Sequence, residues 1–389
     1  MSSPLRGAAA VVGIGQTPYY KRATSPDSEV KLAMRAIDAA CSDAGISTKD
    51  IDGFVSYGSE RSDGQKLVRG LGCREMTFGA LMWTHGGGIP GALGLAATAI
   101  ATGQAKTVAV YRSMAEQNGL RLRIAVQQDD TAAQYIVNGI GAPAQQCAMR
   151  SQRMIEGDGV PPSALRAMVL ASYRHAQNSP IALGRGNLLD EESYAEARWI
   201  SEPYRLFDCS RECDAGMAVV MVAADRAKDL VDRPAYLLSA PMGYTNGWGG
   251  AMEENHHPYT SSGFESVACR LWAESGFGPS DIDVTQVYEN MSGMGVAAII
   301  DHGFCTTEQA GDFFTVENLT APDGKFPINT SGGNLAEGFL HGMGLVPEMV
   351  RQIRGTSPNQ VPNAELSLMT GGPGDMMVSS ALLGSAETL

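Results

Sequence analysis

The strongest constraint on the fold of this chain is an internal repeat that relates its two halves. Residues 41–52 read CSDAGISTKDID and residues 272–283 read WAESGFGPSDID, an offset of 231 residues. Each copy follows an amphipathic stretch and runs into a short apolar segment, GFVSYG or VTQVYE, so that Tyr57 corresponds to Tyr288. A unit of helix, glycine turn and strand that recurs once, far above the period of a solenoid, predicts a duplicated α/β fold.

A second correspondence lies further along each half. The sequence THGG at 84–87 precedes an Ala-rich segment and the apolar run TVAVYRS, and TSGG at 330–333 precedes VPEMVRQIRG and AELSLMTGG. Both patterns predict a helix followed by a strand. We therefore expect a first half over 1–230 and a second half over 231–389. Residues 114–200 lose this rhythm and are expected to form an inserted cap or loop region on the first half.

Composition excludes several classes of protein. The chain has 389 residues, of which 44% are apolar, enough for a sizeable core. Its net charge of −13 argues against nucleic-acid and anionic-membrane partners, because both attract basic surfaces. The uncharged stretch 76–105 contains three consecutive glycines and Pro90, which favours a buried loop and helix over a membrane span. The absence of a signal-peptide pattern and the seven scattered cysteines lead us to expect a cytoplasmic protein with reduced thiols.

Metal and cofactor fingerprints are weak. Cys209 and Cys213 form a C-x3-C without the second pair that a zinc site needs. The run Glu253–His257 has adjacent histidines, which point in different directions on regular structure, so a solvated loop is favoured over a metal site. The segment Gly13–Gly15 lacks the third glycine and the acidic partner of a dinucleotide site, and the lysines lie in charged or turn-like contexts that do not favour a Schiff base. We therefore expect no cofactor.

Several motifs in order along the chain resemble the thiolase superfamily, in the branch of the sterol-carrier-protein-X thiolases and lipid-transfer-protein-type aldolases. The resemblance spans nearly the whole chain. It rests on GIGQT near the N-terminus, the DAGI…DIDG turn, Asp208-Cys209 with Asp214, VYENMSG (287–293), NTSGGNLAEGFLHG (329–342) and MTGGPGD (369–375). It implies a five-layered αβαβα fold, a homodimer and an acyl-CoA thioester as substrate.

The thiolase residues for acyl transfer through cysteine are missing. A thiolase needs a nucleophilic Cys at a helix N-terminus, where the dipole lowers the pKa of the thiol, and that position falls on Gly87. The Gly-His pair of the later motif is replaced by Gly338-Phe339, and the second active-site Cys by Met369. Tyr288-Glu289 stands where thiolases carry Asn-Glu or His-Asp. Claisen chemistry is therefore not expected.

The remaining pattern resembles the steroid side-chain-cleaving aldolases, which use this scaffold without the Cys and bind a small zinc-ribbon/OB-fold partner subunit. Retro-aldol cleavage of a β-hydroxyacyl thioester needs a base for the hydroxyl and donors for the developing enolate. The resemblance implies cleavage of a β-hydroxyacyl-CoA side chain, from a steroid or an isoprenoid, to a ketone or aldehyde and a short acyl-CoA. The alternatives are a non-catalytic acyl-CoA or lipid-binding protein, and an acyltransferase with a displaced nucleophile such as Cys209 or Cys213.

Three side chains are the candidate catalytic residues. Tyr288, at the end of a predicted strand, is the leading acid/base candidate, provided that a neighbour lowers the pKa of its phenol. Tyr244, in a Gly-rich loop, is the second. His341 is the third, since related aldolases often carry Tyr where this chain has Phe339, and an imidazole could replace that donor. The alternative is that Tyr288 packs like Tyr57 and that Tyr244 is an exposed loop residue.

Substrate contacts are expected from the glycine-rich motifs, whose backbone N–H groups, at 86–88 and 371–374, can form an oxyanion site. Four arginines of the inserted region are candidates for the CoA phosphates, or are ordinary surface charges. These arginines are Arg121, Arg123, Arg174 and Arg185. The expected substrate-binding residues are His85, Gly87, Gly332, Gly333, Asn334, Phe339, Gly371 and Gly372.

Overall fold

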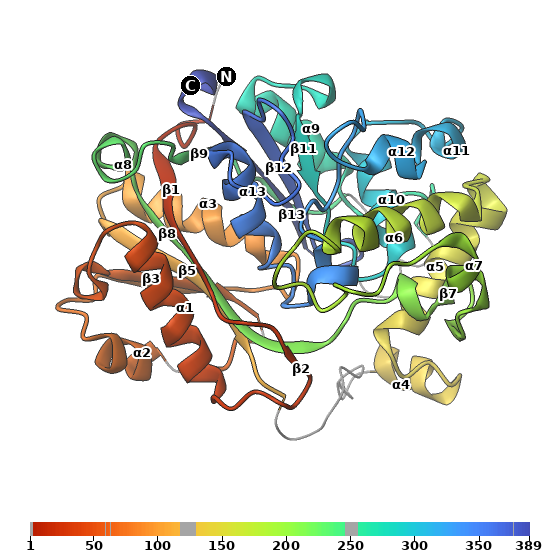
Figure 1. The fold of residues 1–389 in the computed structure, drawn as a ribbon, viewed down its shortest axis with the longest axis horizontal. Helices are drawn as coiled ribbons and strands as arrows, with labels where there is room; N and C mark the ends of the chain where they lie inside the picture. Colours follow the sequence, from red (N-terminus) through yellow and green to blue (C-terminus); the bar gives the residue numbers. More distant parts are fainter. Residues whose placement is uncertain (1–2, 59, 63, 117–129, 246–255, 376) are drawn as a thin grey trace.

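The strands of the two halves are joined by hydrogen bonds into one continuous order of neighbours (Figure 1). The structure is a computed structural model, and it describes residues 3–58, 60–62, 64–116, 130–245, 256–375 and 377–389. The path of neighbouring strands runs β4-β3-β5-β8-β1 through the first half and continues β9-β13-β12-β11 through the second. The bounds are β1 (Ala9–Gln16), β3 (Gly53–Tyr57), β4 (Phe78–Met82), β5 (Thr107–Met114), β8 (Cys213–Ala223), β9 (Ala235–Ser239), β11 (Val284–Gln286), β12 (Leu366–Gly371) and β13 (Val378–Gly384). Two short strands join its sides, β2 (Tyr20–Lys21) on β8 and β10 (Met242–Gly243) on β13, and β6 (Trp199–Ser201) pairs separately with β7 (Tyr204–Arg205).

The helices reproduce the repeat that the sequence predicts. Helix α1 and strand β3 in the first half correspond to α9 and β11 in the second, and α3 with β5 corresponds to α13 with β12. The helices are α1 (Glu29–Asp43), α2 (Gly64–Leu71), α3 (Gly88–Ala101), α4 (Asp130–Val137), α5 (Pro143–Asp158), α6 (Pro162–Ala176), α7 (Glu191–Glu196), α8 (Ala224–Leu230), α9 (Glu265–Ser275), α10 (Ser292–Asp301), α11 (Ala310–Phe313), α12 (Val316–Leu319) and α13 (Leu345–Arg354).

Two buried helices lie between the strands of the two halves. Helix α3 contacts β3 and β5 of the first half and β12 and β13 of the second, and α13 packs on β11 and β12. Helix α3 is apolar almost all round, which is typical of a helix buried on every side. Helices α1 and α9 cover the opposite faces of their strands. The predicted duplicated fold with five alternating layers is confirmed.

Strand β8 is central because its sequence can be buried on both faces. It reads CDAGMAVVMVA, small and apolar throughout except for Asp214, and it is hydrogen-bonded antiparallel to β1 on one side and β5 on the other. Helix α1 packs on it with apolar residues three and four positions apart. The glycine at 216 permits this contact, because a Cβ there would lie 2.4 Å from the carbonyl oxygen of Leu32.

The inserted region packs on the second half, whereas the sequence led us to expect a cap on the first. Helices α5 and α6 share an apolar core with α10 (Figure 1). The close approach depends on glycines of α10: a Cβ at Gly293 would lie 2.3 Å from the Ser151 hydroxyl, and one at Gly295 would lie 2.7 Å from the Met168 sulfur. The chain returns to the central strands at β8. Among the described residues, no helix combines the length and apolarity needed to cross a membrane.

Candidate active site

The candidate site lies where the start of α3 meets the segments that follow β3, β11 and β12. Tyr57 ends β3, Tyr288 follows β11, and Gly371 ends β12. The Tyr288 hydroxyl faces the glycine run before α3, since a Cβ at Gly86 would lie 2.2 Å from its oxygen. A Cβ at Gly371 would lie 3.2 Å from the Gly86 carbonyl oxygen, so the end of β12 also lies against the glycine run before α3.

Three of the predicted site residues form a row of rings. The buried Tyr288 ring stands edge-on to Phe339 with centroids 6.1 Å apart, and Phe339 stands edge-on to His341 at 5.1 Å. The backbone N–H of Tyr288 donates to Thr370 Oγ1 at 3.1 Å. Burial raises the pKa of the Tyr288 phenol well above its ordinary value, and the nearby Asp375 carboxylate raises it further. The phenol therefore stays protonated at neutral pH, which argues against Tyr288 as the base and favours it as a donor.

His341 is held by a buried ion pair that the sequence did not indicate. Its Nδ1 lies 2.8 Å from Nη2 of Arg112. Arg112 is buried, lies 3.5 Å from the Glu60 carboxylate, and stacks on the Tyr57 ring at 5.4 Å. Burial lowers the pKa of His341 well below its ordinary value, and the Arg112 charge lowers it further.

A carboxylate occupies the N-terminus of α3. Asp375 Oδ2 accepts the N–H of Gly87 at 2.9 Å. Burial raises the pKa of Asp375, while the Gly87 bond and the nearby His85 act in the opposite direction. A helix N-terminus favours such an anion. Asp375 is thus the carboxylate at the start of α3. It lies in the MTGGPGD motif, but it was not among the predicted site residues.

Three of the glycine amides expected to form an oxyanion site already donate to protein oxygens. Gly87 donates to Asp375, Gly88 donates to the carbonyl of His85 at 3.0 Å, and Gly374 donates to the carbonyl of Ser262 at 3.2 Å. Buried N–H groups need partners, and in this compact loop cluster the nearest partners are protein oxygens.

A cysteine could not occupy the thiolase position. A Cβ at Gly87 would lie 2.0 Å from the carbonyl oxygen of Met377, and one at Gly372 would lie 2.1 Å from the nitrogen of Gly87. The two glycines allow these backbone segments to touch. The displaced thiols are also poorly suited to attack, because burial raises the pKa of Cys209 to about 12 and raises that of Cys213 as well.

Two of the predicted residues, Gly333 and Asn334, contact a second carboxylate, that of Glu289. Asn334 Nδ2 donates to Glu289 Oε2 at 3.2 Å, and a Cβ at Gly333 would lie 2.0 Å from Oε1 of the same residue. The φ of +60° at Gly333 also favours glycine. Burial raises the pKa of Glu289 to about 8. A Cβ at the neighbouring predicted residue, Gly332, would lie 3.0 Å from that of Ala176 on α6.

Other predicted residues lie apart from this group. Tyr244 is half exposed after β10 and makes no hydrogen bond or ring contact with the Tyr288 row in the part of the chain that the structure describes. Arg174 and Arg185 are exposed, and His257 stacks on Tyr259 at 4.4 Å. Arg121, Arg123 and residues 253–255 lie outside the described residues. Within the described residues, no group of three or more His, Cys, Asp or Glu is placed to hold a metal ion.

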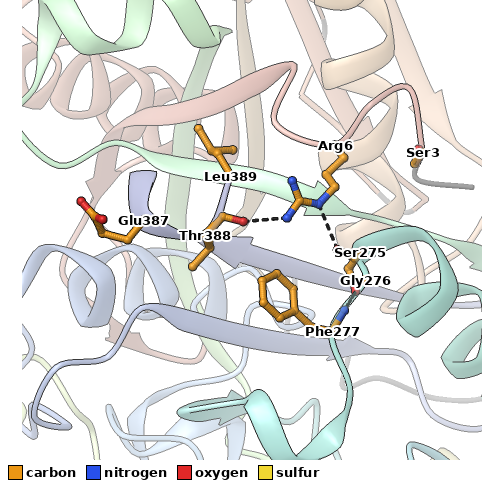
Figure 2. A pocket seen from close by; sticks show the side chains of 8 residues that line it. All are labelled: Ser3, Arg6, Ser275, Gly276, Phe277, Glu387, Thr388 and Leu389. Carbon is orange, nitrogen blue, oxygen red and sulfur yellow. Dashed lines mark hydrogen bonds between the residues drawn. The ribbon is translucent and has the colours of Figure 1, made fainter.

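A cavity of about 650 Å³ lies beside the two termini (Figure 2). Arg6 crosses it and donates to the carbonyls of Ser275 at 2.9 Å and Thr388 at 2.6 Å (Figure 2). Its lining includes no residue of the Tyr288 row. Arg6 therefore ties the chain ends to α9 and is not part of the candidate site.

The signals for the missed residues were present but ambiguous. Arg112 is a charge inside the apolar strand TVAVYRS, and a charge in a buried strand needs a partner. Glu60, 52 positions earlier, gives no sign in the sequence that it is this partner. Asp375 stood in a matched motif, but its capping of α3 depends on two loops that only the fold brings together.

Comparison with known proteins shows which family the chain belongs to. Residues 243–384 match the family model described as thiolase C-terminal domain-like. The chain is 34% identical to the 17-hydroxy-3-oxo-4-pregnene-20-carboxyl-CoA lyase of Mycobacterium tuberculosis, over 98% of this chain and 100% of that protein. It is also 34% identical to the steroid side-chain-cleaving aldolase of Thermomonospora curvata, over 98% of this chain and 99% of that protein.

A solved structure extends the likeness to three dimensions. The structure titled Ltp2-ChsH2(DUF35) aldolase superimposes with a TM-score of 0.92 at 34% sequence identity, and each chain is covered over 100% of its length.

Proposed function

Because this chain belongs to the thiolase superfamily, in the family of the steroid side-chain-cleaving aldolases, we propose that it is a carbon–carbon lyase acting on a β-hydroxyacyl-CoA. One relative matched over its full length is named a 17-hydroxy-3-oxo-4-pregnene-20-carboxyl-CoA lyase, and another is named a steroid side-chain-cleaving aldolase. The proposed products are a ketone or aldehyde and a short acyl-CoA.

The observation that carries this proposal is the exchange of groups at the start of α3. At Gly87, where a thiolase carries its nucleophilic Cys, the space for a side chain is taken by the Met377 carbonyl. The Asp375 carboxylate accepts the Gly87 N–H at the N-terminus of α3. A phenol and an imidazole, from Tyr288 and His341, complete the site. Such a site offers a base and donors but no group for a covalent acyl intermediate, which is what retro-aldol cleavage requires.

In the proposed mechanism, Asp375 accepts the proton of the β-hydroxyl. The bond between Cα and Cβ breaks, the new carbonyl forms at Cβ, and the electron pair of the broken bond moves into the thioester as an enolate. Tyr288 and His341 donate hydrogen bonds to the developing charge. Transfer of the proton from Asp375 to Cα then restores the carboxylate and releases the short acyl-CoA. Tyr288 suits the donor role because burial raises the pKa of its phenol. No cofactor enters the proposed reaction.

We further propose partners of the classes that the resemblance implies, a second copy of this chain and a small zinc-ribbon/OB-fold subunit. Strand β4 ends the sheet, and on or beside it Leu81 is 59% and Trp83 is 73% exposed. An edge strand with large apolar side chains is suited to pairing with another chain.

All seven cysteines are free thiols, which supports a reducing, cytoplasmic location.

The test is an assay of the protein, alone and with such a partner subunit, on a steroid thioester with a hydroxyl at the β carbon. We expect the ketone and the short acyl-CoA in equal amounts, and no cleavage of the same thioester without the hydroxyl. Binding without turnover under both conditions would contradict the proposal. An acyl adduct on Cys209 or Cys213, detected by mass spectrometry, would indicate an acyltransferase instead.

The assignment of the base is tested with Asp375→Asn, which should lower kcat by about 100-fold to 10,000-fold. A base must be deprotonated, so the wild-type rate should fall as the pH drops through the pKa of Asp375, which burial raises above its ordinary value. Asp323→Asn, at an exposed position, is the matched control. Retention of full activity by Asp375→Asn would assign the base elsewhere.

A further inference from the structure

From the buried contact between Arg112 and His341, we infer that Arg112 is a positioning residue that holds the His341 ring neutral, with its proton on Nε2. In that form His341 donates a hydrogen bond to the reacting thioester and cannot act as a base. This inference deepens the proposed function and rests on it.

The tautomer follows from the chemistry of the two partners. An arginine guanidinium has only donors and stays protonated in proteins. Nη2 of Arg112 lies 2.8 Å from Nδ1 of His341, so Nδ1 must accept the hydrogen bond. A neutral ring that accepts at Nδ1 carries its proton on Nε2.

The neutral form follows from the surroundings. The groups that bear on His341 are the cations Arg112 and Arg61 and the nearby His85, and the ring is itself buried. A second positive charge beside Arg112 is therefore unfavourable. The Glu60 carboxylate does not reverse this, because it faces Arg112 at 3.5 Å and accepts the N–H of Ser113 at 2.8 Å.

The ring is also fixed in place. The His341 backbone has a φ of +46°, which is uncommon for a residue with a side chain, and its carbonyl accepts the Tyr57 hydroxyl at 3.2 Å. Phe339 packs edge-on against the imidazole. In the described part of the chain, Nε2 has no hydrogen-bond partner, so its proton is available to a substrate.

The cost of burying Arg112 supports a functional reason for its presence. Within the described residues, its Nε and Nη1 have no hydrogen-bond partner although both atoms are buried. Buried ion pairs contribute little net stability compared with apolar side chains of similar volume. Arg112 leaves two donors without partners but directs a third at His341. Its presence is therefore better explained by the orientation of the His341 ring than by stability.

The experiment is an NMR measurement of the histidine ring nitrogens in the uniformly 15N-labelled, full-length protein. The chain has six histidines, and loss of one signal set in His341→Gln assigns the ring. We expect a protonated Nε2 and an unprotonated Nδ1, unchanged between pH 8 and about pH 5.5, below the ordinary pKa of histidine. A proton on Nδ1, or a charged ring in this range, would overturn the inference.

The variants separate positioning from folding. Arg112→Met combined with Glu60→Gln removes both charges, so that neither is left buried alone. In this double variant His341 should titrate or populate both tautomers, and kcat should fall by about 100-fold with little change in KM. Arg112→Lys, which keeps one cationic donor, should restore the tautomer and part of kcat. An unchanged His341 spectrum in the double variant would overturn the inference.

Arg150→Lys is the matched control, because Arg150 is also buried but donates to the backbone carbonyls of His256, Pro258 and Ser261. It should lower stability without changing the His341 spectrum. The two proposals fail separately. The tautomer is read without substrate, so a wild-type protein with the expected spectrum but no cleavage would contradict only the proposed function.

Discussion

Tyr57 and Tyr288 occupy the same position in the two copies of the repeat, yet their hydroxyls have different surroundings. Tyr57 is buried, donates to the carbonyl of His341 at 3.2 Å, and lies under the Arg112 guanidinium. The Tyr288 hydroxyl faces Gly86 and has no hydrogen-bond partner among the described residues. In the proposed mechanism, one strand end therefore supports the site and the other supplies a hydrogen-bond donor, so equivalent positions of a duplicated fold would have different roles.

The largest effect expected from this comparison is on activity. Tyr288→Phe removes a donor from the site, and we expect kcat to fall by about 100-fold to 1,000-fold, as for the loss of an oxyanion donor. Tyr57→Phe removes a hydrogen bond within the protein and should lower the free energy of unfolding by about 1 kcal/mol, with a smaller loss of activity. Steady-state kinetics and denaturant unfolding on both variants measure the two effects.

The comparison fails if the two variants behave alike. Equal losses of kcat would mean that Tyr57 also reaches the substrate, or that Tyr288 only packs. Full activity in Tyr288→Phe would remove this residue from the proposed mechanism.

The glycines of the second correspondence sharpen the same contrast. Gly86 and Gly332 are equivalent, but a Cβ at Gly86 would meet the Tyr288 hydroxyl at 2.2 Å, whereas Gly332 has a φ of +112° and a Cβ there would lie 3.0 Å from that of Ala176. We expect Gly86→Ala to displace the phenol and reduce kcat, with a loss of stability of about 1–3 kcal/mol. Gly332→Ala should act on stability, through its strained backbone.

These two variants are compared by unfolding and by kcat per folded protein. Gly79→Ala is the control, because a Cβ there meets nothing within 4 Å and its φ is ordinary. If Gly86→Ala keeps full kcat, the Tyr288 hydroxyl has room elsewhere, and its placement against Gly86 is not needed for the reaction.

The repeat shows how far the sequence could lead. Helix–turn–strand units leave a local signature, so the fold class and the correspondence of Tyr57 with Tyr288 were predictable. The side of the molecule on which residues 114–200 pack was not, because it depends on contacts between α6 and α10 across more than 100 residues of chain. The same holds for the site: Tyr288, Phe339 and His341 lie in recognisable motifs, but the approach of Arg112 to His341 and of Asp375 to Gly87 is tertiary.

The residues that follow the two tyrosines also differ, and the effect expected from this difference is on the pH dependence of stability. Gly58 follows Tyr57, while Glu289 follows Tyr288 and is buried, with a pKa raised to about 8. Between its ordinary value of 4.5 and this pKa, the folded chain binds a proton that the unfolded chain does not. Stability should therefore fall as the pH rises through this window, by at most about 1.4 kcal/mol per pH unit from this group.

Glu289→Gln removes this dependence while keeping the size of the side chain, so its stability relative to the wild type should increase as the pH rises from 5 to 8. Urea unfolding at a series of pH values measures the difference. Glu337, also buried with a pKa raised to about 8, contributes in the same direction, so the wild-type curve alone cannot isolate Glu289. Parallel curves for Glu289→Gln and for the exposed-site control Glu192→Gln would mean that Glu289 is ionised in the folded protein. In that case its contacts with Asn334 and the Leu335 N–H outweigh burial, and the second strand end carries a charge that the first lacks.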